Sequence, residues 1–274
     1  MHPEAPSEAT RIALVTGGTR GIGRATVLEL ATAGLDIALT YKQRRDDAQR
    51  VVEEVQAAGR RAVAIQMDLE SPEEIERAMV EVGDHFGHLD VLVANAAATA
   101  FKPLLEVARH NIDRTLAISV HGFVRLVQLS VPLMAGRRAN IVAVSGWDSY
   151  RALTRHGMLG AAKAAMEALV RSLAVELAPL DICVNSVCPG PLDTDSAKVY
   201  AGEKWDRMVE DWVAHTPAGR LGTAEDIARV IRFLASEECR WLRGQVLYAD
   251  GGQSLVTEPV AWFADSGRKP PGDP

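Results

Sequence analysis

A glycine-rich turn near the start of the chain is the feature that most constrains its fold. The turn follows the apolar run 12–15 and precedes a segment, 24–34, in which apolar residues recur at helical spacing. This order predicts a buried strand, a tight turn and a helix. The glycine spacing is Gly17-x-x-x-Gly21-x-Gly23, and glycines there let backbone N–H groups approach a diphosphate at the positive end of the helix. The pattern indicates a dinucleotide site, although such turns also serve only as tight bends.

The residues after the second predicted strand, 36–40, indicate which dinucleotide is bound. A site for NAD places a carboxylate there to accept hydrogen bonds from the ribose. This chain instead has a basic cluster, in which the strand is followed by Tyr41, Lys42, Gln43, Arg44 and Arg45. With Arg20 from the glycine turn, the cluster suits a 2′-phosphate because arginine presents a planar fork of donors. We therefore expect NADPH; the alternative is a solvated basic surface on the following helix.

Several further motifs, in the right order, resemble those of the short-chain dehydrogenase/reductase family from Arg11 to about Ser254. They are Asp68-Leu69 after the third strand, Asn95-Ala96 at the end of the fourth, Asn185 to Gly190 with Thr194, and Asp250-Gly251-Gly252. The resemblance implies that a cofactor contacts the glycine turn, the basic cluster and these strand ends. The implied cofactor residues are Gly17, Thr19, Arg20, Gly21, Ile22, Gly23, Tyr41, Lys42, Arg44, Asp68, Leu69, Asn95, Ala96, Lys163, Pro189, Gly190 and Thr194.

The resemblance implies a single Rossmann-type, doubly wound α/β domain with a central parallel sheet flanked by helices. The residue pattern agrees independently, because apolar strands alternate with longer amphipathic stretches and no internal boundary appears. The predicted strands are near 12–15, 36–40, 62–66, 90–94, 139–144, 181–187 and 245–248. We expect residues 1–10 to form a flexible tail, 11–255 the reductase domain and 256–274 a C-terminal extension.

The catalytic positions implied by the resemblance are mostly substituted. The family fills them with asparagine, serine, tyrosine and lysine, and here they are Ser119, Gly146, Leu159 and Lys163. Ser145 lies one residue before the usual serine position and is the nearest hydroxyl in sequence. Only the lysine is retained, and the resemblance implies that it contacts the nicotinamide ribose.

One variant of the family offers another proton donor. Some of its enoyl reductases place the tyrosine seven residues before the lysine, where this chain has His156. Seven residues are nearly two helical turns, so both side chains share a face if the helix extends that far. Histidine donates protons near neutral pH. Gly157 and Gly160 weaken a helix there, so a structural histidine ahead of the helix is the alternative.

The segment after Pro189-Gly190, about 191–220, corresponds to the family's substrate cover. Within it, Trp205, Met208 and Trp212 recur at three- and four-residue spacing and form an apolar helix face. Indoles suit flat rings, although ordinary packing onto the domain is the alternative. The predicted substrate contacts are Trp147, Leu159, Trp205, Met208 and Trp212.

Composition limits the partners of the chain. The formal charge is −6 at pH 7, so neither nucleic acid nor an anionic membrane is expected to bind. We expect no apolar run as long as a membrane span, and the first residues lack a signal-peptide pattern. The cysteines show no metal-ligand spacing, and their odd number suits a reducing cytoplasm. We expect no metal site, a cytoplasmic protein and, as the resemblance implies, a homotetramer.

These observations predict an NADPH-dependent oxidoreductase that reduces a carbonyl or quinone of a bulky aromatic, polyketide-like substrate without the usual tyrosine acid. Two alternatives stay open: an enoyl-thioester reductase that uses His156, and a catalytically silent NADP-binding subunit. A variant of the main prediction passes an activated hydroquinone to a partner oxygenase.

Overall fold

A parallel sheet of seven strands forms the middle layer of the computed structural model, which describes residues 10–260. The strands are β1 (Ile12–Val15), β2 (Asp36–Tyr41), β3 (Ala62–Gln66), β4 (Val91–Ala94), β5 (Ala139–Val144), β6 (Ile182–Pro189) and β7 (Val246–Ala249). Their order in the sheet is β3-β2-β1-β4-β5-β6-β7, so the direction of winding reverses between β1 and β4. The predicted doubly wound fold is confirmed, and ligands of such sheets bind at this reversal.

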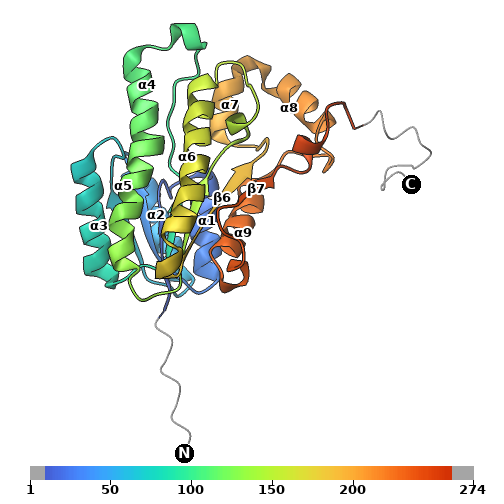
Figure 1. Ribbon diagram of the computed structural model, residues 1–274. Helices are drawn as coiled ribbons and strands as arrows, with labels where there is room; N and C mark the ends of the chain where they lie inside the picture. The colour runs from blue at the N-terminus through green and yellow to red at the C-terminus, as the bar shows by residue number, and fades with distance from the viewer. Residues whose placement is uncertain (1–9, 261–274) are drawn as a thin grey trace, which may run out of the picture.

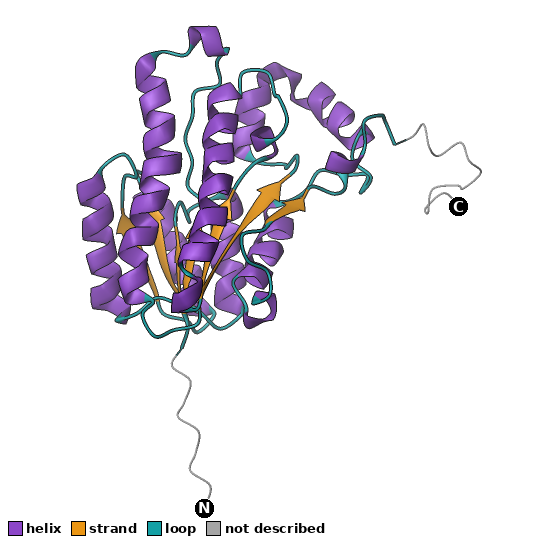
Figure 2. Ribbon diagram, in the orientation of Figure 1, coloured by secondary structure: helices purple, strands orange, loops and turns teal. Residues whose placement is uncertain are grey.

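Helices cover both faces of the sheet (Figures 1 and 2). One layer contains α1 (Gly21–Thr32), α2 (Arg45–Ala57) and α9 (Ala224–Leu234), with α1 packed between the other two. The other layer contains α3 (Pro72–Phe86), α4 (Arg109–Leu116), α5 (Gly122–Leu133) and α6 (Gly157–Glu176). Two further helices, α7 (Asp195–Ala201) and α8 (Trp205–Ala214), lie beyond the end of the sheet to which the strand arrows point.

The alternation of side chains along β1 shows why the core has two halves. Ile12 and Leu14 pack into the cluster that includes Phe123 of α5, whereas Ala13 and Val15 pack into the cluster that includes Leu30 of α1. Neighbouring residues of a strand point to opposite faces. A parallel sheet covered on both faces therefore requires continuous apolar strands, which is the pattern that identified them in the sequence.

The observed strands agree with the predicted ones to within two residues. The largest difference is at β6, which continues to Pro189, where it still pairs with Ala249 of β7. Proline is tolerated at the end of a strand, where the missing N–H interrupts no further pairing. The predicted N-terminal tail and most of the C-terminal extension fall at 1–9 and 261–274, outside the described residues.

One helical segment corrects the expectation about apolar length. Residues 109–133, which join α4, a π-helical turn (Ala117–His121) and α5, are long and apolar enough by length and composition to cross a membrane. Phe123, Leu126 and Val127 of this segment are nevertheless buried in the core against the sheet. The expectation that no run reaches this length is therefore wrong, because a core helix of a large domain passes the same test.

Asp36 at the start of β2 should contribute a pH-dependent part of the stability. Its buried carboxylate accepts hydrogen bonds from Arg60 at 2.7 Å and from the Arg61 side chain at 2.6 Å. Burial raises the pKa of Asp36, but the hydrogen bonds from Arg61 and Arg60 outweigh burial and hold the pKa below its usual value. We expect Asp36→Asn to lower the free energy of unfolding at pH 7 by about 2 kcal/mol, less than for a fully buried pair because Arg61 is exposed.

The sign follows from the depressed pKa of the folded state. The contribution is complete above the unfolded-state value of about 3.9 and is lost as the pH falls through the folded-state value. Urea unfolding of both proteins at pH 7, and at the lowest pH at which the wild type folds, measures the difference. An equal loss at both pH values would contradict the role assigned to the charge.

Candidate active site

The glycine turn after β1 is shaped by a close approach within its own backbone. A Cβ on Gly23 would lie 2.1 Å from the carbonyl oxygen of Gly17, so no larger residue fits there. Gly17 and Gly21 have φ of 67° and 51°, in the left-handed region that favours glycine. No side chain caps the N-terminus of α1 at Arg20. The first N–H groups of the helix are therefore free of a side-chain cap and available to an anion.

Asn95 fixes this turn from the end of β4. Its side-chain amide donates to the carbonyl oxygens of Thr16 at 2.9 Å and of Gly17 at 3.3 Å. In return, the Thr16 hydroxyl accepts hydrogen bonds from the backbone N–H groups of Asn95 and Ala96, both at 3.0 Å. These four bonds join β1 to β4 at the reversal of the sheet, where the site is built.

A cavity of about 440 Å³ opens at this edge of the sheet. Every cofactor residue implied by the sequence lines it except Lys163, Pro189 and Gly190. The remaining lining residues were not among the predicted cofactor residues; they are Thr40, Gln43, Met67, Ala97, Ala98, Arg114, Ile118, Leu192, Asp195 and Ser196. Most of them lie at or just after the end of a strand that the motifs had already located. Their position at these strand ends could therefore have identified them as cavity residues.

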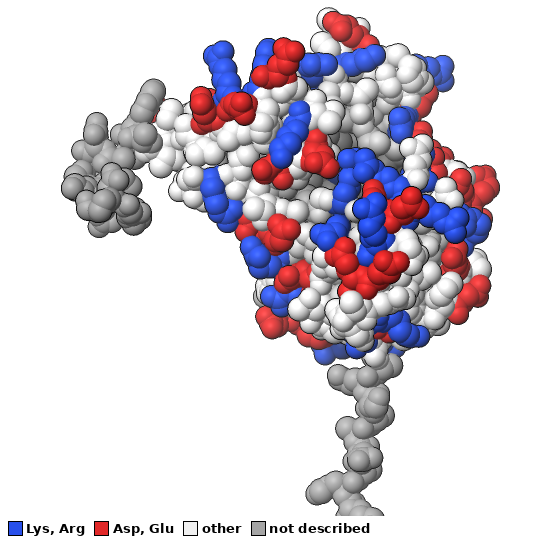
Figure 3. All heavy atoms as spheres, turned by 180° about the vertical axis from the view of Figure 1, so that it is seen from behind, with Lys and Arg blue, Asp and Glu red and all other residues white. Residues whose placement is uncertain are grey.

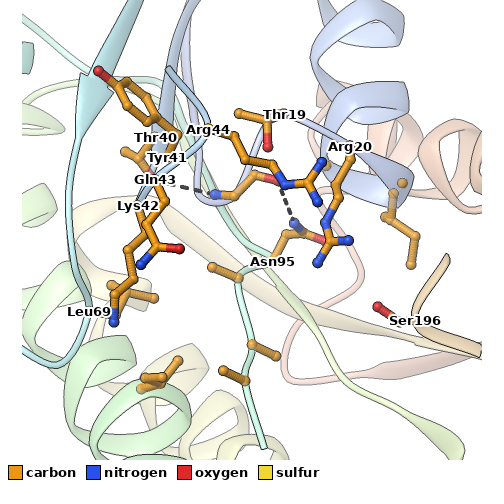
Figure 4. A pocket seen from close by; sticks show the side chains of 18 of the residues that line it. Thr19, Arg20, Thr40, Tyr41, Lys42, Gln43, Arg44, Leu69, Asn95 and Ser196 are labelled. Atoms are coloured by element: carbon orange, nitrogen blue, oxygen red, sulfur yellow. Dashed lines mark hydrogen bonds between the residues drawn. The ribbon is translucent and has the colours of Figure 1, made fainter. Parts of the chain in front are cut away.

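Two arginines form the basic part of the cavity wall. Figure 4 shows the guanidinium groups of Arg20 and Arg44 close to one another over Asn95, while the ring of Tyr41 points away from them. Arg20 and Arg44 are half-exposed, and each lies near one carboxylate: Asp195 at 4.0 Å and Asp47 at 3.2 Å. Figure 3 shows that basic side chains gather on this side of an otherwise mixed surface. This pair of forks fits a 2′-phosphate.

Lys42 corrects one detail of the predicted basic cluster. Its ammonium contacts Asp68 at 2.5 Å and Glu70 at 2.8 Å. The hydrogen bonds that Lys42 donates to the carboxylates of Asp68 and Glu70 raise the pKa of Lys42 above its usual value. The charge of Lys42 is thus balanced by carboxylates from the end of β3, which leaves the two arginines to meet a phosphate.

Lys163 of α6 is buried and contacts the end of β5. Its Nζ donates to the carbonyl oxygen of Val144 at 2.5 Å. Burial lowers the pKa of Lys163 to about 8, although the charges of Asp148 and Glu167 oppose this shift. Leu159, one helical turn earlier on α6, is partly buried and carries no ionisable group.

The two serines predicted as catalytic, Ser145 and Ser119, are both buried away from the cofactor cavity. The Ser145 hydroxyl donates to Glu167 Oε1 at 2.5 Å, and Ser149 donates to the same oxygen at 2.7 Å. Ser119 lies in the π-helical turn, is fully buried, and its hydroxyl has no partner within residues 10–260. Neither Ser145 nor Ser119 lines the cofactor cavity.

His156 lies directly before α6, which is the alternative that the sequence left open. The helix begins at Gly157, and a Cβ there would lie 2.7 Å from the Leu104 side chain. His156 Nδ1 is 3.1 Å from Asp148 Oδ2. Its ring contacts the rings of Phe101 and Tyr200, with centroids 4.7 and 4.4 Å away. The sequence analysis missed Asp148, whose importance appears only once these segments are brought together.

Three indoles from two distant segments gather beyond the end of β5. Trp147 follows β5, and its ring lies 5.7 Å from that of Trp212 on α8, at an interplanar angle of 80°. The Trp205 ring lies 6.4 Å from the Trp212 ring at 90°. These side chains and Met208 are partly exposed, and no residue of α8 is fully buried. The predicted apolar helix face is confirmed, and part of it stays accessible to a ligand.

Comparison with known proteins agrees with this geometry. A family model described as "Enoyl-(Acyl carrier protein) reductase" matches residues 17–254. The chain is 38% identical to a 1-cyclohexenylcarbonyl-CoA reductase of Streptomyces collinus, over 97% of this chain and 94% of that protein. It is 34% identical to the hydroxynaphthalene reductase-like protein Arp2 of Metarhizium anisopliae, over 90% and 96%. A short-chain dehydrogenase from Burkholderia cenocepacia, solved in complex with NADP, superposes with a TM-score of 0.83 at 32% identity, over 90% of this chain and all of that one.

The buried Lys163 should leave a signature in the pH dependence of folding. With a pKa of about 8 when folded and the ordinary lysine value of 10.5 when unfolded, Lys163 binds fewer protons in the folded state between these values. Stability therefore rises with pH through this window. Relative to Lys163→Met, the wild type should gain about 3 kcal/mol between neutral pH and pH 10.5. Urea unfolding without added nucleotide measures the difference, and a constant difference between the two proteins would refute it.

Proposed function

The chain belongs to the short-chain dehydrogenase/reductase family, and we propose that it is an NADPH-dependent reductase of bulky, ring-containing, conjugated substrates. The observation that carries the proposal is the pairing of two neighbouring sites. A dinucleotide cavity with two arginines lies beside a lysine whose preceding helical turn presents Leu159. Three indoles lie beyond it.

The residues of the cavity suit NADPH. The glycine turn and the start of α1 would hold the diphosphate, Arg20 and Arg44 the 2′-phosphate, and Asp68 with Leu69 the adenine side. Lys163 and the segment from Pro189 to Thr194 would meet the nicotinamide half. Reduced nicotinamide supplies a hydride, and the protein's task is to orient the substrate, exclude water and provide for the charge that remains on it.

Leu159 cannot donate a proton, so the substrate must be one that can be reduced without a donor at this position. Hydride addition to a simple ketone leaves an alkoxide. Its basicity is comparable to that of hydroxide, whose conjugate acid, water, has a pKa of about 15.7. Reduction of a quinone leaves a phenolate-like oxygen with a pKa of about 10, like that of tyrosine. The gap of roughly 6 pKa units means that the oxyanion left by quinone reduction is more stable by on the order of 8 kcal/mol. Such a product needs no strong proton donor. A polycyclic aromatic ketone or quinone is therefore the first candidate, and the similarity to Arp2 supports it.

A second candidate has its own support. In the reduction of a cyclic enoyl thioester, the charge left by hydride transfer spreads into the conjugated thioester. The relative from Streptomyces collinus is named as a reductase of this kind of substrate. His156, at the position seven residues before Lys163, is paired with Asp148 and could serve as its proton donor. Both candidates share the cofactor, the indole cover and a conjugated acceptor.

We also propose that the chain associates with copies of itself. Trp241 is 98% exposed, and Tyr248 of the edge strand β7 is about half-exposed. An edge strand leaves backbone groups unpaired on one side, and large exposed apolar side chains next to it favour burial against a partner. Light scattering would give the number of subunits, and the expectation from the family is four.

A substrate panel tests the proposal and separates the two candidates. Oxidation of NADPH should be followed by absorbance with naphthoquinones, polycyclic hydroxyketones and 1-cyclohexenyl thioesters of CoA. We expect turnover with one of these conjugated classes and none with simple aliphatic ketones, because only a conjugated substrate delocalises the charge. Tight binding of NADPH with no turnover of any substrate would favour the catalytically silent subunit instead.

The indoles should act on the substrate rather than on the cofactor. Replacing Trp205 and Trp212 together by alanine should raise the KM at least tenfold, because stacking contributes about 1 kcal/mol or more for each ring. The Kd for NADPH should stay within about twofold, because neither residue lines the dinucleotide cavity. Val199→Ala, at an exposed position of α7, is the control. Equal losses in both quantities would show that the indoles serve only as packing.

A further inference from the structure

A buried carboxylate–imidazole pair lies beside the lysine of the site. Asp148 belongs to the short 3₁₀ turn (Trp147–Ser149) that follows β5, and His156 directly precedes α6. Asp148 Oδ2 and His156 Nδ1 are 3.1 Å apart, and the side chains are 4% and 13% exposed. Neither residue lines the cofactor cavity, so the pair has no role in binding the dinucleotide there.

Two glycines make room for Asp148. A Cβ on Gly146 would lie 2.7 Å from Asp148 Oδ1, and a Cβ on Gly160 would lie 2.3 Å from the Asp148 carbonyl oxygen. Real Cβ atoms do not approach other atoms so closely. A larger residue at position 160 would therefore displace the backbone of the turn, and one at position 146 would displace the Asp148 carboxylate. Gly146 is the position at which the family resemblance places a serine. The carboxylate of Asp148 thus takes the space that a side chain at residue 146 would need.

The free nitrogen of His156 has no partner. Nε2 is buried and makes no hydrogen bond within the described part of the chain. The imidazole is held between Phe101, from the loop after β4, and Tyr200 of α7, whose hydroxyl donates to the Thr154 carbonyl at 3.1 Å. A buried polar atom without a partner is costly and requires an explanation. A ligand group that enters between the loop and α7 would provide the missing partner.

The charges around the pair explain why a carboxylate is needed. His156 lies at the N-terminus of α6, where the helix dipole places partial positive charge next to the ring. Lys163, two turns further along α6, adds a second positive charge, and Asp148 is close enough to oppose the effect of burial on that lysine. Glu167 is engaged by two serine hydroxyls. Asp148 is therefore the carboxylate in contact with the imidazole.

We propose that Asp148 is a positioning residue that holds His156 as the proton donor of the reaction; this inference rests on the proposed function. When a hydride adds to the electrophilic carbon of the substrate, the Nε2–H bond of His156 breaks and its proton moves to the substrate oxygen or α-carbon. The imidazole becomes neutral and keeps its Nδ1–H on Asp148. The substrate thus gains one hydride from NADPH and one proton from His156. A second cavity, of about 470 Å³, borders the pair and gives water a route to return the proton.

Substitutions that preserve size test this role. We expect His156→Gln to lower kcat about 100-fold or more, as general acids contribute, and Asp148→Asn to lower it at least about tenfold. The double variant should be no slower than His156→Gln alone, because the two residues act as a unit. The Kd for NADPH and the unfolding temperature should change little. Asp84→Asn, the same chemical change at an exposed site, is the control.

A second readout does not depend on turnover. Nitrogen NMR of the histidine side chains, in protein without substrate, should show the proton of neutral His156 on Nδ1 in the wild type. In Asp148→Asn the amide also offers a donor, so this preference should be lost. Full activity of His156→Gln, full activity of Asp148→Asn, or an unchanged tautomer in Asp148→Asn would each overturn the inference. A wild type that binds NADPH but reduces nothing would refute the proposed function, whereas the NMR result alone would decide whether Asp148 orients the ring.

Discussion

The close approach of Gly23 to the carbonyl of Gly17 is the constraint on which the site depends. Because Gly23 has no Cβ, the two segments can approach this closely, and the chain turns from β1 into α1 within a few residues. The start of the helix then points into the cavity. Asn95 fixes the turn by donating hydrogen bonds to the carbonyl oxygens of Thr16 and Gly17 at its start. The phosphate-binding end is therefore built from backbone geometry, and the two arginines add selectivity to a place already defined.

The catalytic end is organised differently, because its polar groups are buried and paired with each other. Lys163 donates to a backbone carbonyl, Ser145 and Ser149 share one oxygen of Glu167, and His156 contacts Asp148. Buried polar groups are expensive unless they are satisfied. Against that background, the Nε2 of His156 and the hydroxyl of Ser119, which have no partner within residues 10–260, and the partly exposed indoles are the features left for a substrate. This arrangement agrees with a reaction that asks little of a strong acid and more of a shaped, apolar site.

The fold could be predicted from the sequence because each strand is a buried apolar run and each run follows a turn or helix signal. The cofactor residues followed from local motifs at strand ends, and the structure gathers nearly all of them. What escaped prediction depends on contacts between distant segments. Lys42 is neutralised by Asp68 and Glu70 from another strand end, and Leu104 of a distant loop occupies the space that a side chain at Gly157 would need. Asp148 becomes significant only through the room left by two glycines fourteen residues apart in sequence.

The most direct test of the account uses NADPH that carries deuterium at the transferred position. After reaction with the best substrate of the panel, mass spectrometry and NMR of the product would locate the label. With a ketone or an enoyl thioester, hydride transfer from NADPH predicts one deuterium on a single carbon, the former carbonyl carbon or the β-carbon of the enoyl group, and a solvent-derived proton on the neighbouring atom. With a quinone, whose hydroquinone product keeps no hydrogen on the reduced carbon, it predicts instead a slower reaction with the deuterated cofactor. A ketone or enoyl product without deuterium, formed while the cofactor is oxidised, or a quinone reaction whose hydride-transfer step is not slowed by deuterium, would contradict the assignment of this chain as a reductase.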